Sequence, residues 1–108
     1  LSRLGQLSLA GCEEVDDRGV RALSGGCAAL RELSLARVPR LTDAALLALA
    51  EAPFAPWLHT LDLNGCPMIT STGVSWLADR CGRVARLSVA GTRVRTSVLR
   101  AVAGQWPF

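Results

Sequence analysis

Lysine is absent from this sequence, although the chain is basic overall: all twelve basic residues are arginines, and the formal net charge is +3. Long apolar runs are also missing, since no stretch approaches the ~18 consecutive apolar residues that span a bilayer. No basic start followed by an apolar core marks a signal peptide at the first residue. With a hydrophobic fraction of 50%, the sequence is typical of a folded protein outside the membrane.

The residues needed for most chemistry are scarce. No Cys-x-x-Cys pair occurs and His59 is the single histidine, so no zinc-ligand set can be assembled from the usual spacings. Asp62 follows His59 three residues later, but no G-x-S-x-G or phosphate-loop pattern accompanies them. The sequence therefore predicts no enzyme, no metal and no cofactor.

Positive charge gathers near one end of the chain. Six arginines fall within residues 80–100, where no acidic residue occurs, whereas four acidic residues cluster within 13–17. The six are Arg80, Arg83, Arg86, Arg93, Arg95 and Arg100. No aromatic residues are interleaved with them and no known reader motif is present, so the sequence favours a solvated face or an acidic neighbouring segment over nucleic acid.

What the sequence does contain is a repeat. "LGQLSLAGCEEV" (4–15), "LRELSLARVPRL" (30–41) and "LHTLDLNGCPMI" (58–69) share the template L-x-x-L-x-L-x-x-(Cys or Val)-x-x-(aliphatic), and "VARLSVAGTRV" (84–94) is a shortened fourth copy. Leu4, Leu30, Leu58 and Val84 begin the copies, at separations of 26, 28 and 26 residues. Self-similarity at such a period is typical of a repeat architecture.

Each copy changes its hydrophobic period along its length. Leu61 and Leu63 alternate as strand residues do, whereas Gly73, Val74 and Leu77 follow the spacing of one helical face. Each repeat is therefore predicted to be a short strand followed by a helix. One slot just before the helical phase holds a residue able to cap the helix through its side-chain oxygen. It is occupied by Asp16, Thr42 and Thr70.

Two copies carry a more specific resemblance. "LSLAGCEEVDDRGVRALSGGCAAL" and "LDLNGCPMITSTGVSWLADRCGRV" fit the pattern L-x-L-x-x-C-x-x-(I/V)-(T/D)-x-x-G-(L/V)-x-x-L-x-x-x-C. With about residues 4–102 covered, the chain resembles leucine-rich-repeat proteins, and within them the cysteine-containing subclass found in F-box/leucine-rich-repeat proteins. The resemblance implies an α/β solenoid in a horseshoe arc, with parallel strands on the concave face and helices on the convex face.

The resemblance also implies a function and a set of partners. It implies a protein–protein interaction module, and one interpretation is the substrate-recognition repeats of an F-box-type ubiquitin ligase subunit, which would reach its adaptor through a segment outside this chain. The alternative is a structural or regulatory repeat scaffold, such as an effector or receptor fragment, with no ubiquitin connection. No F-box occurs in the 108 residues, and the lack of lysine leaves no side-chain acceptor for ubiquitin.

The domain organisation follows from the repeat. We expect one leucine-rich-repeat domain over residues 1–108, with about four repeats at approximately 4–29, 30–57, 58–83 and 84–108. Because the first residue is Leu and not Met, a piece of a longer protein is expected. Trp106 and Phe108 are expected to cover the last repeat, unless the chain is truncated there.

The four cysteines are predicted to be free thiols that fill packing positions. Cys12 and Cys66 share one slot of the repeat, and Cys27 and Cys81 share another. Equivalent residues two repeats apart should lie roughly 10 Å apart, beyond the ~7 Å Cα limit for a disulfide. Val38 occupies the first slot in the second repeat, as expected where the slot serves packing. Free thiols and the lack of a signal or membrane segment favour a cytoplasmic or nuclear location.

Candidate binding residues are those between the strand leucines, which would line the concave face. Most of these positions hold small, uncharged residues, so a purely scaffolding stretch is the competing interpretation. The residues predicted to bind a protein partner are Glu32, Arg37, Asp62, Asn64 and Arg86.

A two-residue insertion in the second repeat, within "EAPFAPWLH", brings two further candidates. Phe54 and Trp57 could anchor a partner, since insertions in repeats often form binding loops. We favour the alternative that both fold back to fill the gap, because large aromatics dominate core energetics. Trp76, in a predicted helix, is expected to cover the neighbouring repeat.

Overall fold

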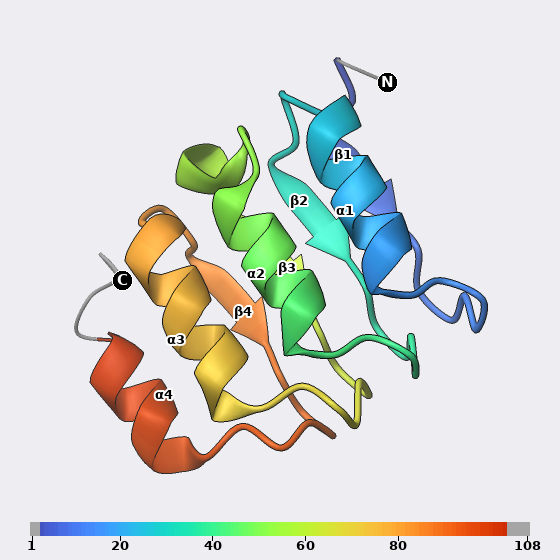
Figure 1. Cartoon of the computed structure of the whole chain (residues 1–108). Coiled ribbons are helices and arrows are strands. Elements are labelled where there is room, and N and C mark those ends of the chain that lie inside the picture. The colour runs from blue at the N-terminus through green and yellow to red at the C-terminus, as the bar shows by residue number, and fades with distance from the viewer. Residues whose placement is uncertain (1–2, 104–108) are drawn as a thin grey trace.

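The computed structural model describes residues 3–103, with side chains through residue 99. Short strands and helices alternate along the chain (Figure 1). In order they are β1 (Gln6–Ser8), α1 (Asp17–Gly26), β2 (Glu32–Ser34), α2 (Asp43–Glu51), the 3-10 turn η1 (Ala55–Trp57), β3 (Thr60–Asp62), α3 (Ser71–Arg80), β4 (Arg86–Ser88) and α4 (Thr96–Ala103). The predicted strand-then-helix unit is confirmed. Trp106 and Phe108 lie outside the described residues.

The strands form one parallel sheet in the order β1-β2-β3-β4. Equivalent repeat positions pair across it, so that Leu7, Leu33, Leu61 and Leu87 lie in one row. All four helices cover the same face of this open sheet (Figure 1), which gives two layers. The predicted α/β class with a parallel sheet is confirmed, and the horseshoe arc stays a prediction.

The core lies between the two layers. Because successive strand residues point to opposite faces, the middle leucine of each strand faces the helices while its neighbours face outward. Burial is deepest in the centre of the chain: Leu33 and Leu61 are 2% and 1% exposed, whereas Leu7 and Leu87 at the two edges are only partly buried. Each repeat thus buries its apolar side against its neighbours, as stacked repeats require.

Side-chain caps start the first three helices, as the sequence predicts. Asp16, Thr42 and Thr70 each accept a hydrogen bond from a backbone N–H two or three residues later, at 3.1, 3.2 and 3.3 Å. These bonds satisfy N–H groups that have no partner within the helix. The capping slot therefore sets where each helix begins.

A second set of bonds joins neighbouring helices. The Asp17 carboxylate, at the start of α1, accepts from the backbone N–H and the hydroxyl of Thr42 at 2.9 and 2.7 Å. Asp43, at the start of α2, does the same for Thr70, with the backbone bond at 2.8 Å. Ser71, at the start of α3, accepts from a backbone N–H of the next repeat at 2.9 Å. These bonds, which the sequence did not predict, tie the capping residues Thr42 and Thr70 to the preceding helix.

The cysteines are all free, and three of the four are buried. Cys66 donates from its thiol to the Leu35 carbonyl of the preceding repeat at 3.0 Å. Cys12 is exposed, so the prediction of a buried packing position is wrong there. The reason is its place in the sheet: β1 is an edge strand among the described residues, and nothing in that range supplies the contact that Leu35 gives to Cys66.

Helix α3 packs closely on α2, which generates a test. A β-carbon at Gly73 would lie 2.5 Å from Oδ1 of Asp43 and 2.6 Å from Cδ1 of Leu46. Neither neighbour can yield, because Asp43 holds Thr70 and Leu46 is fully buried. We expect Gly73→Ala to lower the free energy of unfolding by about 1–3 kcal/mol, measured by urea unfolding.

The matched control for this substitution is Gly19→Ala. Gly19 occupies the same slot of the first repeat, and a β-carbon there meets nothing closer than Val15 Cγ1 at 3.6 Å. Removing a helical glycine without a clash should stabilise the protein by about 0.5–1 kcal/mol. Equal effects of the two substitutions would contradict the steric explanation.

Thiol burial generates a second test, at alkaline pH. Burial raises the pKa of the Cys81 thiol from 9.0 to about 11, and burial likewise raises the pKa of Cys66. The folded state therefore favours the protonated thiol, and the stability present below pH 9 is lost as the pH rises toward 11. The chain has neither lysine nor tyrosine, so no side-chain amine or phenol obscures the effect of these two thiols.

We expect the free energy of unfolding to fall by about 2 kcal/mol between pH 9 and pH 11, measured by urea unfolding at each pH. Cys81→Ala should remove most of this dependence. The exposed Cys12 provides the control, and a dependence that vanishes equally in Cys12→Ala would rule out burial as its cause.

Candidate functional site

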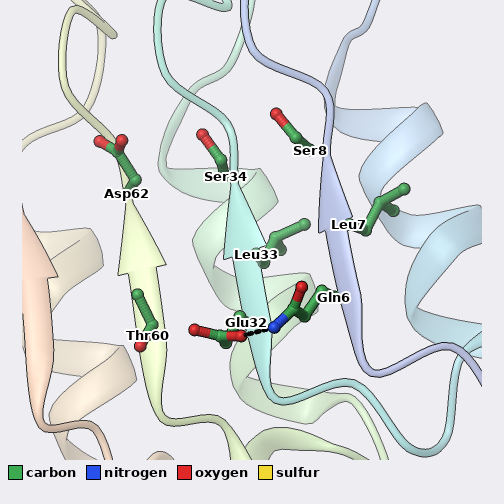
Figure 2. A pocket seen from close by; sticks show the side chains of 8 residues that line it. All are labelled: Gln6, Leu7, Ser8, Glu32, Leu33, Ser34, Thr60 and Asp62. Carbon is green, nitrogen blue, oxygen red and sulfur yellow. Dashed lines mark hydrogen bonds between the residues drawn. The ribbon is translucent and has the colours of Figure 1, made fainter.

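The outward side chains of β1, β2 and β3 surround a shallow hollow of about 510 Å³ on the sheet face opposite the helices (Figure 2). It is lined by the outward-facing residues Gln6, Ser8, Glu32, Ser34, Thr60 and Asp62, and by Leu7 and Leu33, which lie between them in β1 and β2. Two rows of side chains cross it, one from the first strand residues and one from the third (Figure 2). Strand alternation produces this arrangement, because only every second residue faces outward.

Two carboxylates give the hollow its charge. Glu32 accepts a hydrogen bond from the side-chain amide of Gln6, and Asp62 Oδ1 accepts from the backbone N–H of Asn64 at 3.0 Å. Both acidic side chains are only partly buried and remain open to a ligand. The site can therefore attract a cation, and the neighbouring serine and threonine hydroxyls can donate or accept hydrogen bonds.

The other predicted residues lie around the hollow. Arg86, at the start of β4, pairs in register with Thr60, so it is beside the hollow without lining it. Asn64 follows β3, and its side-chain oxygen accepts from the backbone N–H of Ala90 at 2.8 Å. Asn64 therefore already has a structural task, since it ties its repeat to the turn after β4. The structure brings together Glu32 and Asp62, and the binding role of all five residues stays a prediction.

Arg37 lies in the turn after β2 and has an unusual backbone. The same slot in the other repeats holds Gly11, Gly65 and Gly91, with φ of 77°, 75° and 74°, and Arg37 adopts φ of 56°. A side chain in this left-handed region costs roughly 1–2 kcal/mol, which glycine avoids. An arginine here is thus unfavourable for the fold, and such strain is typical of positions kept for binding.

The insertion before β3 separates its two aromatic residues. Phe54 is fully buried, which confirms that it fills the gap opened by the insertion. Trp57 is 44% exposed, so the prediction that it also folds inward is wrong. The cause is η1, which is closed by a bond from the Trp57 backbone N–H to the Phe54 carbonyl at 2.9 Å. One aromatic side chain reaches the core, and the other remains at the surface.

Trp57 lies close to two arginines, Arg31 of its own repeat and Arg83 of the next. The guanidinium carbon of Arg83 lies over the indole ring, 4.2 Å from its centroid, and that of Arg31 lies at 5.6 Å. We call these three residues the Arg–Trp rim, since each precedes a strand. Sequence reasoning missed the contact. The sequence did contain one indication of this contact. Trp57 and Arg83 occupy equivalent positions of neighbouring repeats, each one residue before the buried residue that begins the next copy.

Other chemistry finds little support in the part of the chain that the structure describes. His59 is exposed, and its Nδ1 lies 2.9 Å from the hydroxyl of Thr60. Over residues 3–99, no group of three or more His, Cys, Asp or Glu side chains could hold a metal ion. None of the described helices is both long and apolar enough to cross a membrane.

Two comparisons relate this geometry to known proteins. Residues 54–78 match the family described as Leucine Rich repeat. The chain is also similar to the Antagonist of mitotic exit network protein 1 of Eremothecium gossypii, with 36% identity over 101 residues. The match covers 90% of this chain and 25% of that protein, so the chain spans about a quarter of its relative's length. These likenesses support a leucine-rich-repeat protein, a class whose repeats are typically interaction modules.

The backbone of Arg37 provides a test of its role. We expect Arg37→Gly to raise the free energy of unfolding by about 1 kcal/mol, because glycine adopts positive φ without the steric penalty. Arg37→Ala removes the same charge but keeps the penalty, so it should give no such gain. Thermal unfolding of both variants measures the difference, and equal melting temperatures would contradict strain at this slot.

Proposed function

We propose that this protein is a protein-recognition module whose open sheet face receives a partner. The observation that carries the proposal is the hollow over β1 to β3, where two carboxylates stand among small hydroxyl side chains. The framework beneath it is rigid, since every strand is paired in register and backed by a helix. A preformed polar surface of this kind suits recognition of a second chain, because little conformational entropy is lost on binding.

Within this proposal the five candidate residues have different tasks. Glu32 and Asp62 attract a basic side chain of the partner into the hollow. Arg86 supplies a cation beside them, so that the surface carries both signs of charge and fixes the partner's orientation. Arg37, in the turn after β2, would extend this surface, and Asn64 has an amide nitrogen to donate while its oxygen accepts from the backbone N–H of Ala90.

The larger assembly has two candidates. Resemblance to the cysteine-containing repeats supports a substrate-recognition role in an F-box-type ubiquitin ligase, with the adaptor bound by a segment outside these 108 residues. The similarity to an antagonist of a mitotic exit network supports a regulatory scaffold without a ligase connection. In both cases we propose one domain of about four repeats, in the cytoplasm or nucleus, where free thiols such as Cys12 stay reduced.

The test is recovery of partners by the tagged full-length protein from its own cells, identified by mass spectrometry. We expect Glu32→Gln with Asp62→Asn to weaken capture of a direct partner by about tenfold, because both carboxylates that face its cation become neutral. Glu51→Gln with Asp79→Asn is the matched control. It makes the same charge change at exposed positions of α2 and α3, on the other layer.

Each outcome decides one part of the proposal. Recovery of a cullin and its adaptor supports the ligase role, whereas recovery of cell-cycle regulators alone supports the scaffold. If the hollow variant keeps every partner, or if the helix-face control loses them equally, recognition does not use the hollow and this part of the proposal is wrong.

A further inference from the structure

We infer that the Arg–Trp rim is a second binding surface, which takes an acidic segment of a partner protein. The inference does not depend on the proposed role of the hollow. The rim lies where the chain enters the strands: Arg31 directly precedes β2, and Trp57 and Arg83 each lie three residues before a strand. The second and third repeats, 30–57 and 58–83, thus contribute to one exposed cluster, with no acidic member.

The indole holds both guanidinium groups in position. A guanidinium stacked on an aromatic face keeps its N–H edge free, since the attraction uses the face of the cation. Arg31 donates one long hydrogen bond of 3.4 Å to the Leu30 carbonyl, and its other N–H groups remain available. Organising these long side chains before binding reduces the entropy that a ligand would otherwise have to overcome.

The charges of the rim are not neutralised within the described structure. Among residues 3–99, the one ion pair joins Arg40 to Glu14 at 3.8 Å, and it includes neither arginine of the rim. Arg31 and Arg83 therefore present two cations without a carboxylate. A carboxylate accepts paired hydrogen bonds from a guanidinium edge, so Asp or Glu side chains fit this surface best.

The geometry also limits the spacing of the acidic groups. Both guanidinium carbons lie over one ring, at 4.2 and 5.6 Å from its centre, so they are separated by at most about 10 Å. An extended peptide advances about 3.3 Å per residue. Two acidic residues up to three positions apart could therefore meet both arginines at once.

Nucleic acid fits the surface less well. Binding to a nucleic-acid backbone usually depends on several arginine or lysine contacts to successive phosphates. The rim offers only two cations and one exposed aromatic ring. The neighbouring sheet face carries Glu32 and Asp62, which would repel a polyanion that continued beyond the rim. A short acidic peptide can end before it reaches them.

Fluorescence anisotropy with the full chain tests this inference. The probe is a fluorescein-labelled peptide with two Glu-Ser-Gly-Glu units, and its all-Gln counterpart is the neutral reference, both at low ionic strength. We expect the Glu peptide to bind and Arg83→Gln to weaken that binding by about tenfold, since a bidentate, charge-assisted contact is lost. Arg95→Gln, the same change at an exposed arginine in the turn before α4, should alter affinity by less than about twofold.

Trp57→Leu tests whether the indole ring contributes by positioning the two arginines, because it leaves their charges unchanged. It keeps both arginines but removes the ring, and we expect roughly a threefold loss of affinity. Because these side chains are exposed or half-exposed, the variants should fold, which thermal unfolding verifies.

Several results would overturn the inference. They are equal binding of the Gln peptide, an equal loss in Arg95→Gln, or no binding of the Glu peptide. Tighter binding of a single-stranded oligonucleotide that depends on the same arginines would replace the acidic peptide by nucleic acid. Glu32→Gln with Asp62→Asn should keep the Glu-peptide affinity, so failure of the hollow and failure of the rim are distinguishable.

Discussion

In-register pairing of the four strands is the constraint on which the rest of this structure depends. Leu33 pairs with Leu61 although 28 residues separate them, two more than separate Leu7 from Leu33. The register of β2 on β3 is the same as that of β1 on β2, so the two extra residues lie outside the paired strands. They are accommodated in the segment before β3 that contains η1. The surface position of Trp57 is thus a consequence of keeping the leucines in register.

The helices keep the same repeat spacing as the strands, but side-chain contacts between neighbouring helices maintain it. A glycine at 73 and the Asp43 carboxylate allow α3 to lie close to α2 and tie its cap in place. In the first repeat, no preceding repeat packs on the outer side within the described residues. Cys12 and Gly19 therefore lack the contacts that Cys66 and Gly73 make, and both are exposed. The burial of a repeat residue therefore depends on its neighbour in the stack as much as on its own position in the strand or helix.

Much of the fold could be predicted from periodicity and capping chemistry. Leu61 and Leu63 mark a strand, and Thr70 marks a helix start, because local spacing alone decides them. The candidate site was less accessible. Glu32 and Asp62 could be assigned to the same face from strand alternation, but contacts that cross repeats depend on side-chain conformation. The stacking of Arg83 on Trp57 is of this kind, and so is the outward turn of Trp57 itself.

The first and third residues of every strand face away from the helices, and this has a consequence for what the surface can recognise. Outward side chains form a grid with intervals of about 4.8 Å across the strands and nearly 7 Å along them. Backbone geometry fixes these intervals, whereas the side chain at each node can change without disturbing the core. The binding groups of a partner must therefore match the spacing of these outward side chains as well as their charge. Specificity can change when these side chains are substituted, while the backbone and the core stay the same.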